Sequence, residues 1–234
     1  HLQEDARAAR YRLLRSLVAE IGAAAILTAH TLDDQAETVL MRLMRGSGPA
    51  GLQGILARRS FGELVIIRPL LAIAKSRLVA TCDARGWPYV TDPSNADPRF
   101  DRARLRTVMP ALAREGLSAE RLALLALRMQ RTQGALEQLA CAVRRDVTFA
   151  VRGRTAYDAV RLCGEPEDIV LTVLRHLVEE VQGACNDWQP LRLSRLEALT
   201  GRLIAAVAAG EPFNGTLAEV LVRVRRGILT VTPA

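Results

Sequence analysis

The sequence lacks the features that would place the chain in a membrane or in an oxidising compartment. No apolar run reaches the ~18 residues that a membrane-spanning helix needs, and the amino end has no basic stretch followed by an apolar one. The four cysteines are far apart in the sequence and form no C-x-x-C pair. They are Cys82, Cys141, Cys163 and Cys185. This spacing argues against a structural zinc site and a disulfide framework, and it favours reduced thiols in a cytoplasmic protein.

Lysine is also nearly absent. Of the 32 basic residues only Lys75 is lysine, and the formal net charge of the 234-residue chain is +7. A basic balance suits a polyanionic partner such as nucleic acid. Because a preference for arginine can reflect genome composition alone, the charge favours RNA or DNA without identifying either. With 50% hydrophobic and 24% charged residues, the composition is that of a globular protein with a substantial core.

Helical and apolar segments alternate through the first 92 residues. This rhythm predicts an α/β fold with a parallel sheet. The predicted helices cover residues 3–22, about 31–46 and 74–86, and the predicted strands cover residues 24–29, 64–70 and 88–92.

The pattern changes after the turn-rich segment at residues 92–98. From Asp101 to about residue 145 it is helical, with breaks predicted near Pro110 and Gly116. Further helices are predicted over residues 166–181 and 191–209, and the end of the chain reads as a hairpin that turns at Arg226–Gly227. We therefore expect two domains, residues 1–110 and 111–234, the second mainly helical with a small terminal β element.

The stretch from His30 to Gly48, HTLDDQAETVLMRLMRGSG, places acids at the start of a helix. Thr31 is a good N-cap, and Asp34 follows three residues later, close to a capping box. The helix dipole favours acids in a first turn. Asp33 and Asp34 alone therefore indicate no function.

The spacing of polar residues in this stretch indicates more. At 100° per residue, one stripe of the helix holds His30, Asp34, Glu37 and Met41. An apolar stripe lies roughly opposite and consists of Leu32, Ala36, Val39, Leu40 and Leu43. We expect the apolar stripe to pack on the sheet and the acidic stripe to face away from the core. It would then lie at the carboxyl end of strand 24–29, where ligands bind in open α/β sheets. Two carboxylates one turn apart could hold an ammonium group or Mg²⁺, and His30 could meet a nucleotide.

The combined motif HTLDDQAETVLMRLMRGSGPAGLQG resembles the signature of tRNA(Ile)-lysidine synthetases, members of the N-type ATP pyrophosphatase (PP-loop) superfamily. Three further segments agree in the same order: ARAARY at residues 6–11, IIRPLL with KSR at 66–77, and DPSNADPRFDRARLR at 92–106. The resemblance is close from about residue 3 to 110 and looser beyond. It implies a Rossmann-like PP-loop domain followed by a mainly helical tRNA-binding domain.

The resemblance also implies a reaction and its partners. These enzymes use ATP, with Mg²⁺, to adenylate the C2 oxygen of the wobble cytidine in a tRNA(Ile) that carries a CAU anticodon. The side-chain amine of L-lysine then displaces AMP and forms lysidine. The family is often dimeric, so a homodimer is possible.

Roles for individual residues follow from the same resemblance. Asp34 and Glu37 would bind the lysine ammonium and orient the amine. Asp33 would support these two residues, lie near Mg²⁺, or only interact favourably with the helix dipole. His30 would border the ATP, and Arg7 or Arg10 would approach its triphosphate. The contacts to the tRNA or the activated nucleotide would come from Arg102, Arg104 and Arg106.

Two departures from the family pattern stand out. Ala103 replaces the family's asparagine, and the phosphate loop S-G-G-x-D-S does not occur in the 234 residues. We expect the chain to be the carboxyl-terminal part of a lysidine synthetase that is inactive by itself. The alternatives are another PP-loop tRNA-modifying enzyme, which the lack of cysteine pairs disfavours for a thiolase, and a non-catalytic RNA-binding derivative.

Overall fold

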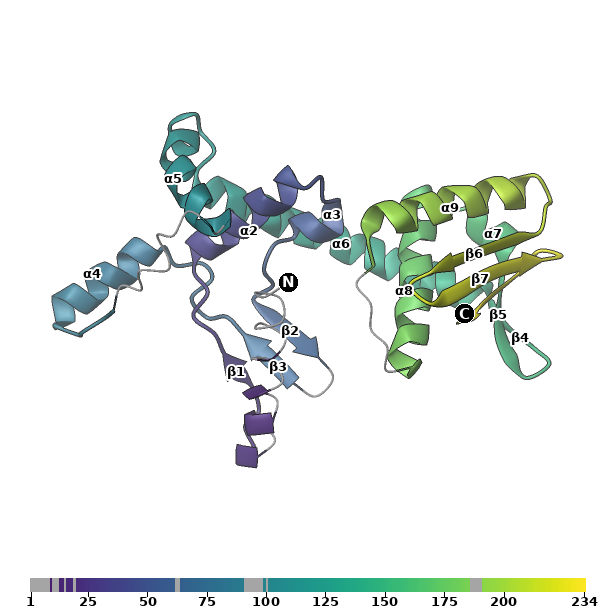
Figure 1. Ribbon diagram of the computed structural model, residues 1–234, viewed down its shortest axis with the longest axis horizontal. Coiled ribbons are helices and arrows are strands. Elements are labelled where there is room, and N and C mark those ends of the chain that lie inside the picture. The colour runs from purple at the N-terminus through teal and green to yellow at the C-terminus, as the bar shows by residue number, and fades with distance from the viewer. Residues whose placement is uncertain are drawn as a thin grey trace. The chain divides into compact units, whose positions relative to one another are not determined.

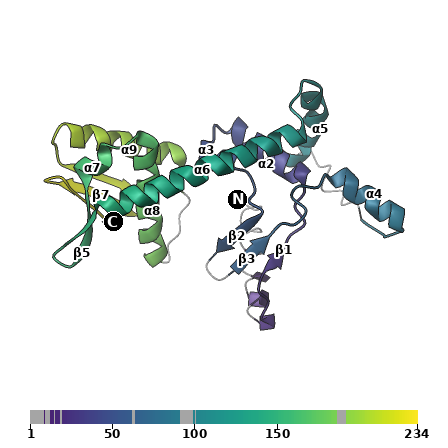
Figure 2. The ribbon, with the colours of Figure 1, turned by 180° about the vertical axis from the view of Figure 1, so that it is seen from behind.

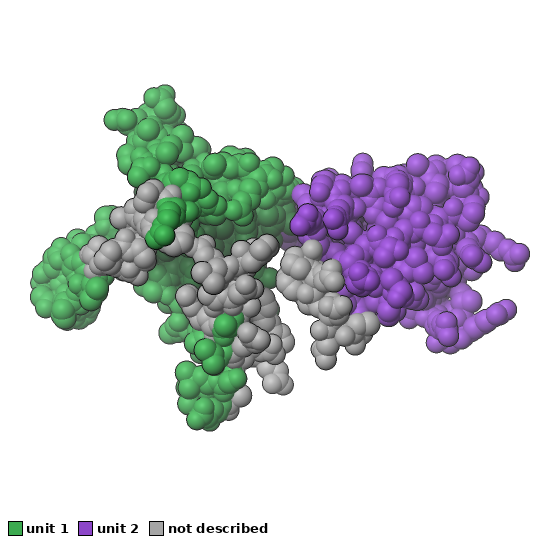
Figure 3. Space-filling model, in the orientation of Figure 1, with its two compact units in different colours: residues 1–130 green, residues 131–234 purple. Residues whose placement is uncertain are grey.

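The computed structural model describes residues 9, 13–14, 16–18, 20–61, 64–90, 99, 101–185 and 191–234 (Figure 1). The chain forms two compact units, His1–Gln130 and Arg131–Ala234, which Figure 3 colours separately. The division falls inside the long helix α6 (Ala119–Val147). A domain boundary near residue 110 stays a prediction. Within the described residues, no helix is long and apolar enough to cross a membrane.

The first unit contains a three-stranded sheet with the order β1–β3–β2. Strands β1 (Ile26–Leu27) and β3 (Leu64–Ile67) are parallel, and β2 (Arg58–Phe61) pairs with β3 in the antiparallel sense. The α/β class and the strands expected within residues 24–29 and 64–70 are confirmed. The third predicted strand is wrong over residues 88–90, which are exposed and form no strand pairing with any residue that the structure describes. Residues 91–92 lie outside the described part of the chain.

The helices of the first unit are α2 (Leu32–Met44), α3 (Pro49–Leu52), α4 (Lys75–Arg85), α5 (Asp101–Arg114) and the first part of α6. The break expected at Pro110 is wrong, because α5 runs through it to Arg114. A proline inside a helix removes one backbone hydrogen bond, and Pro110 sits on the exposed side near the end of α5. The break expected near Gly116 is confirmed, where φ is +90°.

Helix α2 packs against two helices instead of packing on the sheet as expected (Figure 2). Its small and branched apolar residues meet apolar side chains of α5 and α6. This buried cluster consists of Ala36, Val39, Leu40, Leu105, Leu122 and Ala126. The burial of Ala36, Val39 and Leu40 on the apolar stripe of α2 was therefore predicted correctly, but the helices that they pack against were not. Leu43, at the end of the same stripe, remains 46% exposed.

The second unit joins helices to a five-stranded antiparallel sheet with the order β4–β5–β8–β7–β6. Its strands are β4 (Thr148–Val151), β5 (Arg154–Asp158), β6 (Phe213–Leu217), β7 (Val220–Arg225) and β8 (Ile228–Pro233). Its helices, after α6, are α7 (Ala159–Cys163), α8 (Glu167–Cys185) and α9 (Leu193–Ala208). The terminal hairpin at Arg226–Gly227 is confirmed as β7–β8. The sequence did not predict β4, β5 and β6 as further strands of the same sheet.

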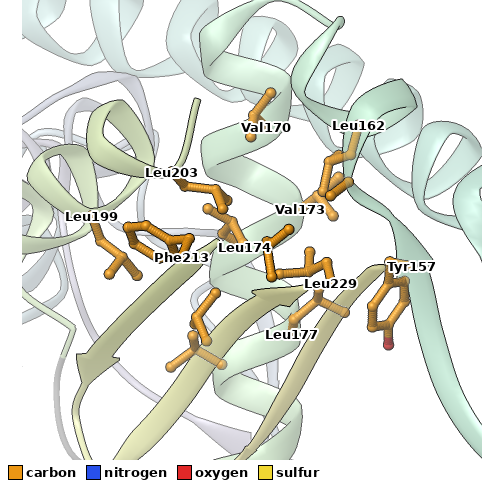
Figure 4. Close-up of a cluster of buried hydrophobic side chains, with 14 of the residues drawn as sticks. Tyr157, Leu162, Val170, Val173, Leu174, Leu177, Leu199, Leu203, Phe213 and Leu229 are labelled. Atoms are coloured by element: carbon orange, nitrogen blue, oxygen red, sulfur yellow. The ribbon is translucent and has the colours of Figure 1, made fainter. Parts of the chain in front are cut away.

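The core of the second unit lies where α8 and α9 cover this sheet (Figure 4). Strand β7 shows why, since Val220, Val222 and Val224 are buried while Arg223 and Arg225 are exposed. Alternate side chains of a strand point to opposite faces. The helices contribute leucine and valine side chains to the same core, among them Val173, Leu174, Leu177, Leu199 and Leu203.

Candidate active site

The first turn of α2 is fixed by a complete capping box. The Asp34 carboxylate oxygen Oδ2 accepts from the Thr31 backbone N–H at 2.8 Å and from the Thr31 hydroxyl at 2.9 Å. The Asp34 N–H donates to Thr31 Oγ1 at 3.4 Å. This box satisfies backbone donors that would otherwise lack partners at a helix start. One Asp34 oxygen is therefore structural, which leaves Oδ1 as the atom that can face a ligand.

Asp33 joins α2 to α4. Its Oδ2 accepts from the backbone N–H of Lys75, the first residue of α4, at 2.7 Å. The N-cap position of α4 is Ala74, which has no side-chain acceptor. Asp33 therefore caps a helix other than its own. The sequence could not indicate this contact, because 42 residues separate the two groups.

Glu37 was expected on a face turned away from the core, and this expectation is wrong because its side chain is only 3% exposed. Both carboxylate oxygens of Glu37 accept from Arg106 of α5. The Nε–Oε1 distance is 2.6 Å and the Nη2–Oε2 distance is 3.3 Å. The hydrogen bond to Glu37 raises the pKa of Arg106 and outweighs the opposing effect of burial. Parallel two-point pairs of this kind are strong and directional.

A second pair lies next to the first. Arg102 Nη1 is 4.0 Å from Asp34 Oδ1, and both side chains are partly exposed. Asp34 and Glu37 are three residues apart on α2, and Arg102 and Arg106 are four apart on α5, so each acid meets one arginine. We call these four residues the α2–α5 charge cluster. It brings together four of the predicted site residues.

Arg104 lies outside this cluster. Its guanidinium pairs with Asp101 one turn earlier on α5, and both side chains are about half exposed. Asp101 also accepts from Arg45 at 3.2 Å. Ala103, which replaces the family's asparagine, is 6% exposed. The asparagine position therefore points into the protein in this chain.

His30 follows β1 at the carboxyl end of the parallel pair of strands, as expected. Its Nδ1 atom lies 2.9 Å from the Thr28 hydroxyl, which fixes the orientation of the ring. Its role beside ATP stays a prediction. Arg7 and Arg10 lie outside the described residues.

The described residues offer no ready metal site. Among them, no group of three or more His, Cys, Asp or Glu side chains could hold a metal ion. Asp33 is used by the Lys75 N–H and Glu37 is used by Arg106. A Mg²⁺ ion prefers several oxygen ligands. The acids of α2 do not fit such an ion as they stand.

The chain is similar to known proteins along nearly its whole length. Residues 1–112 match the PP-loop domain model. A tRNA(Ile)-lysidine synthase of Methylobacterium sp. (strain 4-46) is 53% identical over 235 residues, covering 99% of this chain and 68% of that protein. One of Methylobacterium nodulans is also 53% identical, with 99% and 69% covered. One of Bradyrhizobium sp. (strain BTAi1) is 38% identical over 250 residues, with 100% and 69% covered.

Proposed function

The chain belongs to the tRNA(Ile)-lysidine synthase family, and from this premise we propose that it joins L-lysine to a cytidine of tRNA(Ile) with the use of ATP. The observation that carries the proposal is the 53% identity to relatives of that name over 99% of the chain. The basic charge of +7 suits an RNA substrate.

The proposed reaction has two steps. The C2 oxygen of the wobble cytidine attacks the α-phosphorus of ATP, and pyrophosphate leaves. The ε-amine of lysine then attacks C2, the C2–O bond breaks, AMP leaves, and the amine loses a proton. The second step needs an amine held close to C2 and in the right direction, a positioning effect that can supply several kcal/mol.

The α2–α5 charge cluster is our candidate for holding the lysine. Asp34 Oδ1 is the acceptor that the capping box leaves over, and Arg102 stands only 4.0 Å away. We propose that an ammonium group takes the place of Arg102 at Asp34, since a carboxylate on a fixed helix needs no reorganisation. Glu37 can join only if the ammonium displaces Arg106 as well. Arg102 would then be available to a phosphate of the tRNA or the activated nucleotide.

Other parts of the proposal rest on the family alone. Mg²⁺ would come bound to the phosphates of ATP, and we assign it no ligand from this chain. A homodimer and a cytoplasmic location agree with the family resemblance. The predicted roles of His30 at ATP and of Arg104 at the tRNA also belong here.

Incorporation of radiolabelled lysine tests the function. The protein, together with any in-frame sequence that precedes His1, is incubated with ATP, labelled L-lysine and a tRNA(Ile) transcript with a CAU anticodon. We expect acid-precipitable label and one AMP per lysine incorporated. The matched control is initiator tRNA(Met), which has the same anticodon and should remain unlabelled. Equal labelling of both RNAs, or AMP formation without lysine incorporation, would contradict the proposal.

A further inference from the structure

A cavity of about 600 Å³ opens in the first unit, on the side of α2 that carries Leu32 and Gln35. It lies at the carboxyl ends of β1 and β3, between Leu32 at the start of α2, Pro69 after β3, and Leu127 of α6. Ligands bind at this edge of open α/β sheets. At 100° per residue, Leu32 and Gln35 point away from Asp34 and Glu37 on α2. The cavity is therefore separate from the α2–α5 charge cluster.

Arg68 gives this cavity its charge. The side chain lines the cavity and is only 6% exposed. Its Nη1 donates to the backbone carbonyl of Leu56 at 2.6 Å, while Nε finds no hydrogen-bond partner in the described part of the chain. Within the described residues no carboxylate pairs with this guanidinium. Buried charges in proteins are normally paired, because an unpaired one costs several kcal/mol.

The other lining groups define which anion would fit. The exposed Arg58 adds a second cation, and none of the described residues that line the cavity is acidic. Free lysine has a net positive charge, and its two ammonium groups would find no carboxylate among the described lining residues. The triphosphate of ATP carries several negative charges, whereas Arg58 and Arg68 are the two cations among the described lining residues. The lining therefore favours a ligand with a small negative charge.

The walls of the cavity suit a flat, apolar body. Most of the lining is aliphatic, with Leu71 and Leu124 among its larger members. The side-chain amide of Gln35 donates to the carbonyl of Ile55 and accepts from its N–H. Gln35 therefore lines the cavity with its polar atoms already hydrogen-bonded. The amide nitrogen of Gln130 donates to the Gln53 carbonyl at 2.8 Å, which holds its side chain at the cavity and leaves its oxygen to accept from a ligand. An exocyclic amine of a nucleobase is such a donor.

We propose that this cavity receives one unpaired nucleotide of the tRNA, with its phosphate on Arg68 and its base against the aliphatic wall. The proposal rests on the proposed function, which supplies an RNA with an open anticodon loop. Sequence-specific RNA recognition uses unstacked loop bases in this way. The energy needed to unstack a loop base is small compared with that for a base in a duplex. Arg68 is then kept as a buried cation because the RNA provides its counter-ion.

Three variants separate this role from others. Arg68→Met removes the charge and keeps the length of the side chain. Ala123→Phe fills part of the cavity from α6 and keeps the Arg68 guanidinium. Arg77→Met is the matched control, because it removes one exposed cation on α4 that does not line the cavity.

The probes are a labelled CAU anticodon stem-loop and a blunt RNA duplex of equal length. We expect Arg68→Met and Ala123→Phe to weaken stem-loop binding about tenfold, as the loss of a charged hydrogen bond would, and to leave duplex binding unchanged. Arg77→Met should affect both RNAs slightly and equally. The melting temperature of Arg68→Met without RNA should be unchanged or higher, because a buried unpaired charge is removed.

Other results would overturn the proposal in distinguishable ways. Stem-loop binding that survives both cavity variants would overturn this proposal and leave the proposed function standing. A lowered melting temperature in Arg68→Met with unchanged affinity would make Arg68 a structural donor to Leu56. Free ATP that binds the wild type but not Arg68→Met, with stem-loop binding unaffected, would assign the cavity to a cofactor. Absence of any tRNA binding by the wild type would overturn both proposals.

Discussion

Arg106 of α5 holds both carboxylate oxygens of Glu37 of α2, through hydrogen bonds of 2.6 and 3.3 Å. The two residues are 69 positions apart in the sequence, and Glu37 is almost fully buried under the contact. The pair therefore connects the helix that begins after β1 with the helix that carries the arginines predicted to contact the tRNA. Any ligand that reaches Glu37 must compete with a guanidinium already in place.

Breaking this pair from the arginine side should be costly. In Arg106→Met the carboxylate of Glu37 stays buried without a counter-ion, and we expect a loss of roughly 2–4 kcal/mol in the free energy of unfolding. Glu37→Gln should cost less, because an amide is easier to bury than a charge. Urea unfolding of each variant measures both values.

A double variant and a surface control sharpen this prediction. Glu37→Leu combined with Arg106→Met removes both charges and should be more stable than Arg106→Met alone. Arg104→Met breaks a pair whose partners are both about half exposed, so its cost should stay under about 1 kcal/mol. If Arg104→Met and Arg106→Met lower the free energy of unfolding equally, the Glu37–Arg106 pair stabilises the protein no more than a surface ion pair does.

Asp34→Asn should separate the structural role of Asp34 from its role toward lysine. An asparagine oxygen can still accept from Thr31 and keep the cap, while the negative charge is lost. We expect the KM for lysine to rise at least about tenfold, as for loss of a charge-assisted contact, with the KM for ATP unchanged. Steady-state lysidine formation at varied lysine and varied ATP measures both constants. An equal rise in both would point to a distorted helix, which circular dichroism would detect.

Local patterns in the sequence predicted most of the helices and the parallel strand pair. Thr31 and Asp34 show why, since a capping box depends only on residues three positions apart. The hairpin at Arg226–Gly227 is equally local, because two consecutive positive φ values suit the tight turn between β7 and β8. The positions of the candidate site residues on α2 followed from the helical period.

The contacts of those residues could not be predicted in the same way. Asp33 to Lys75 and Glu37 to Arg106 each join groups more than forty positions apart. The helical period separates polar from apolar faces, but it does not say whether a polar face meets solvent or another polar face. Arg68 shows a related limit, since no sequence pattern marks an arginine as buried without an acid.

Asp33→Ala should loosen α4 more than α2. The variant removes the acceptor for the Lys75 N–H, and loss of a cap typically costs about 1 kcal/mol. None of the α4 residues is buried, so little tertiary packing can compensate. We expect faster amide hydrogen exchange in residues 75–85 and unchanged exchange in residues 35–44. Asp33→Asn keeps an acceptor and serves as the control. Equal protection of α4 in the alanine and asparagine variants would contradict the capping role.

Gly54 is predicted to be intolerant of any side chain for two separable reasons. Its φ is +65°, and an added Cβ would lie 2.6 Å from Gln35 Oε1. Gly46 has nearly the same φ, +67°, with nothing within 4 Å of an added Cβ. Gly46→Ala should therefore cost about 1 kcal/mol from backbone strain alone. Gly54→Ala should cost at least about 1 kcal/mol more, because Gln35 must also give up its bonds to Ile55. Thermal unfolding of both variants tests the difference, and equal costs would show that Gln35 moves away freely.

Glu137 should make the stability of the second unit depend on pH. Its carboxylate, on α6, accepts from the Gln133 amide at 2.7 Å. The same carboxylate lies 2.5 Å from His176 Nε2 and pairs with Arg175, and these two residues belong to α8. Burial acts to raise the pKa of Glu137, but these hydrogen bonds and charges outweigh it and lower the pKa below its ordinary value.

A carboxyl group with a lowered pKa in the folded state contributes stability above its ordinary pKa, and it loses that contribution as the pH falls through the lowered value. Glu137→Gln should therefore reduce the free energy of unfolding by roughly 1–2 kcal/mol at neutral pH, and the difference from wild type should shrink below about pH 4.5, the ordinary value of the group. Urea unfolding of wild type and variant between pH 3 and 8 measures this difference in the free energy of unfolding. Glu180→Gln, at a side chain that is 61% exposed, is the control and should show a much smaller difference. A difference for Glu137→Gln that grows as the pH falls would mean that burial dominates over its partners.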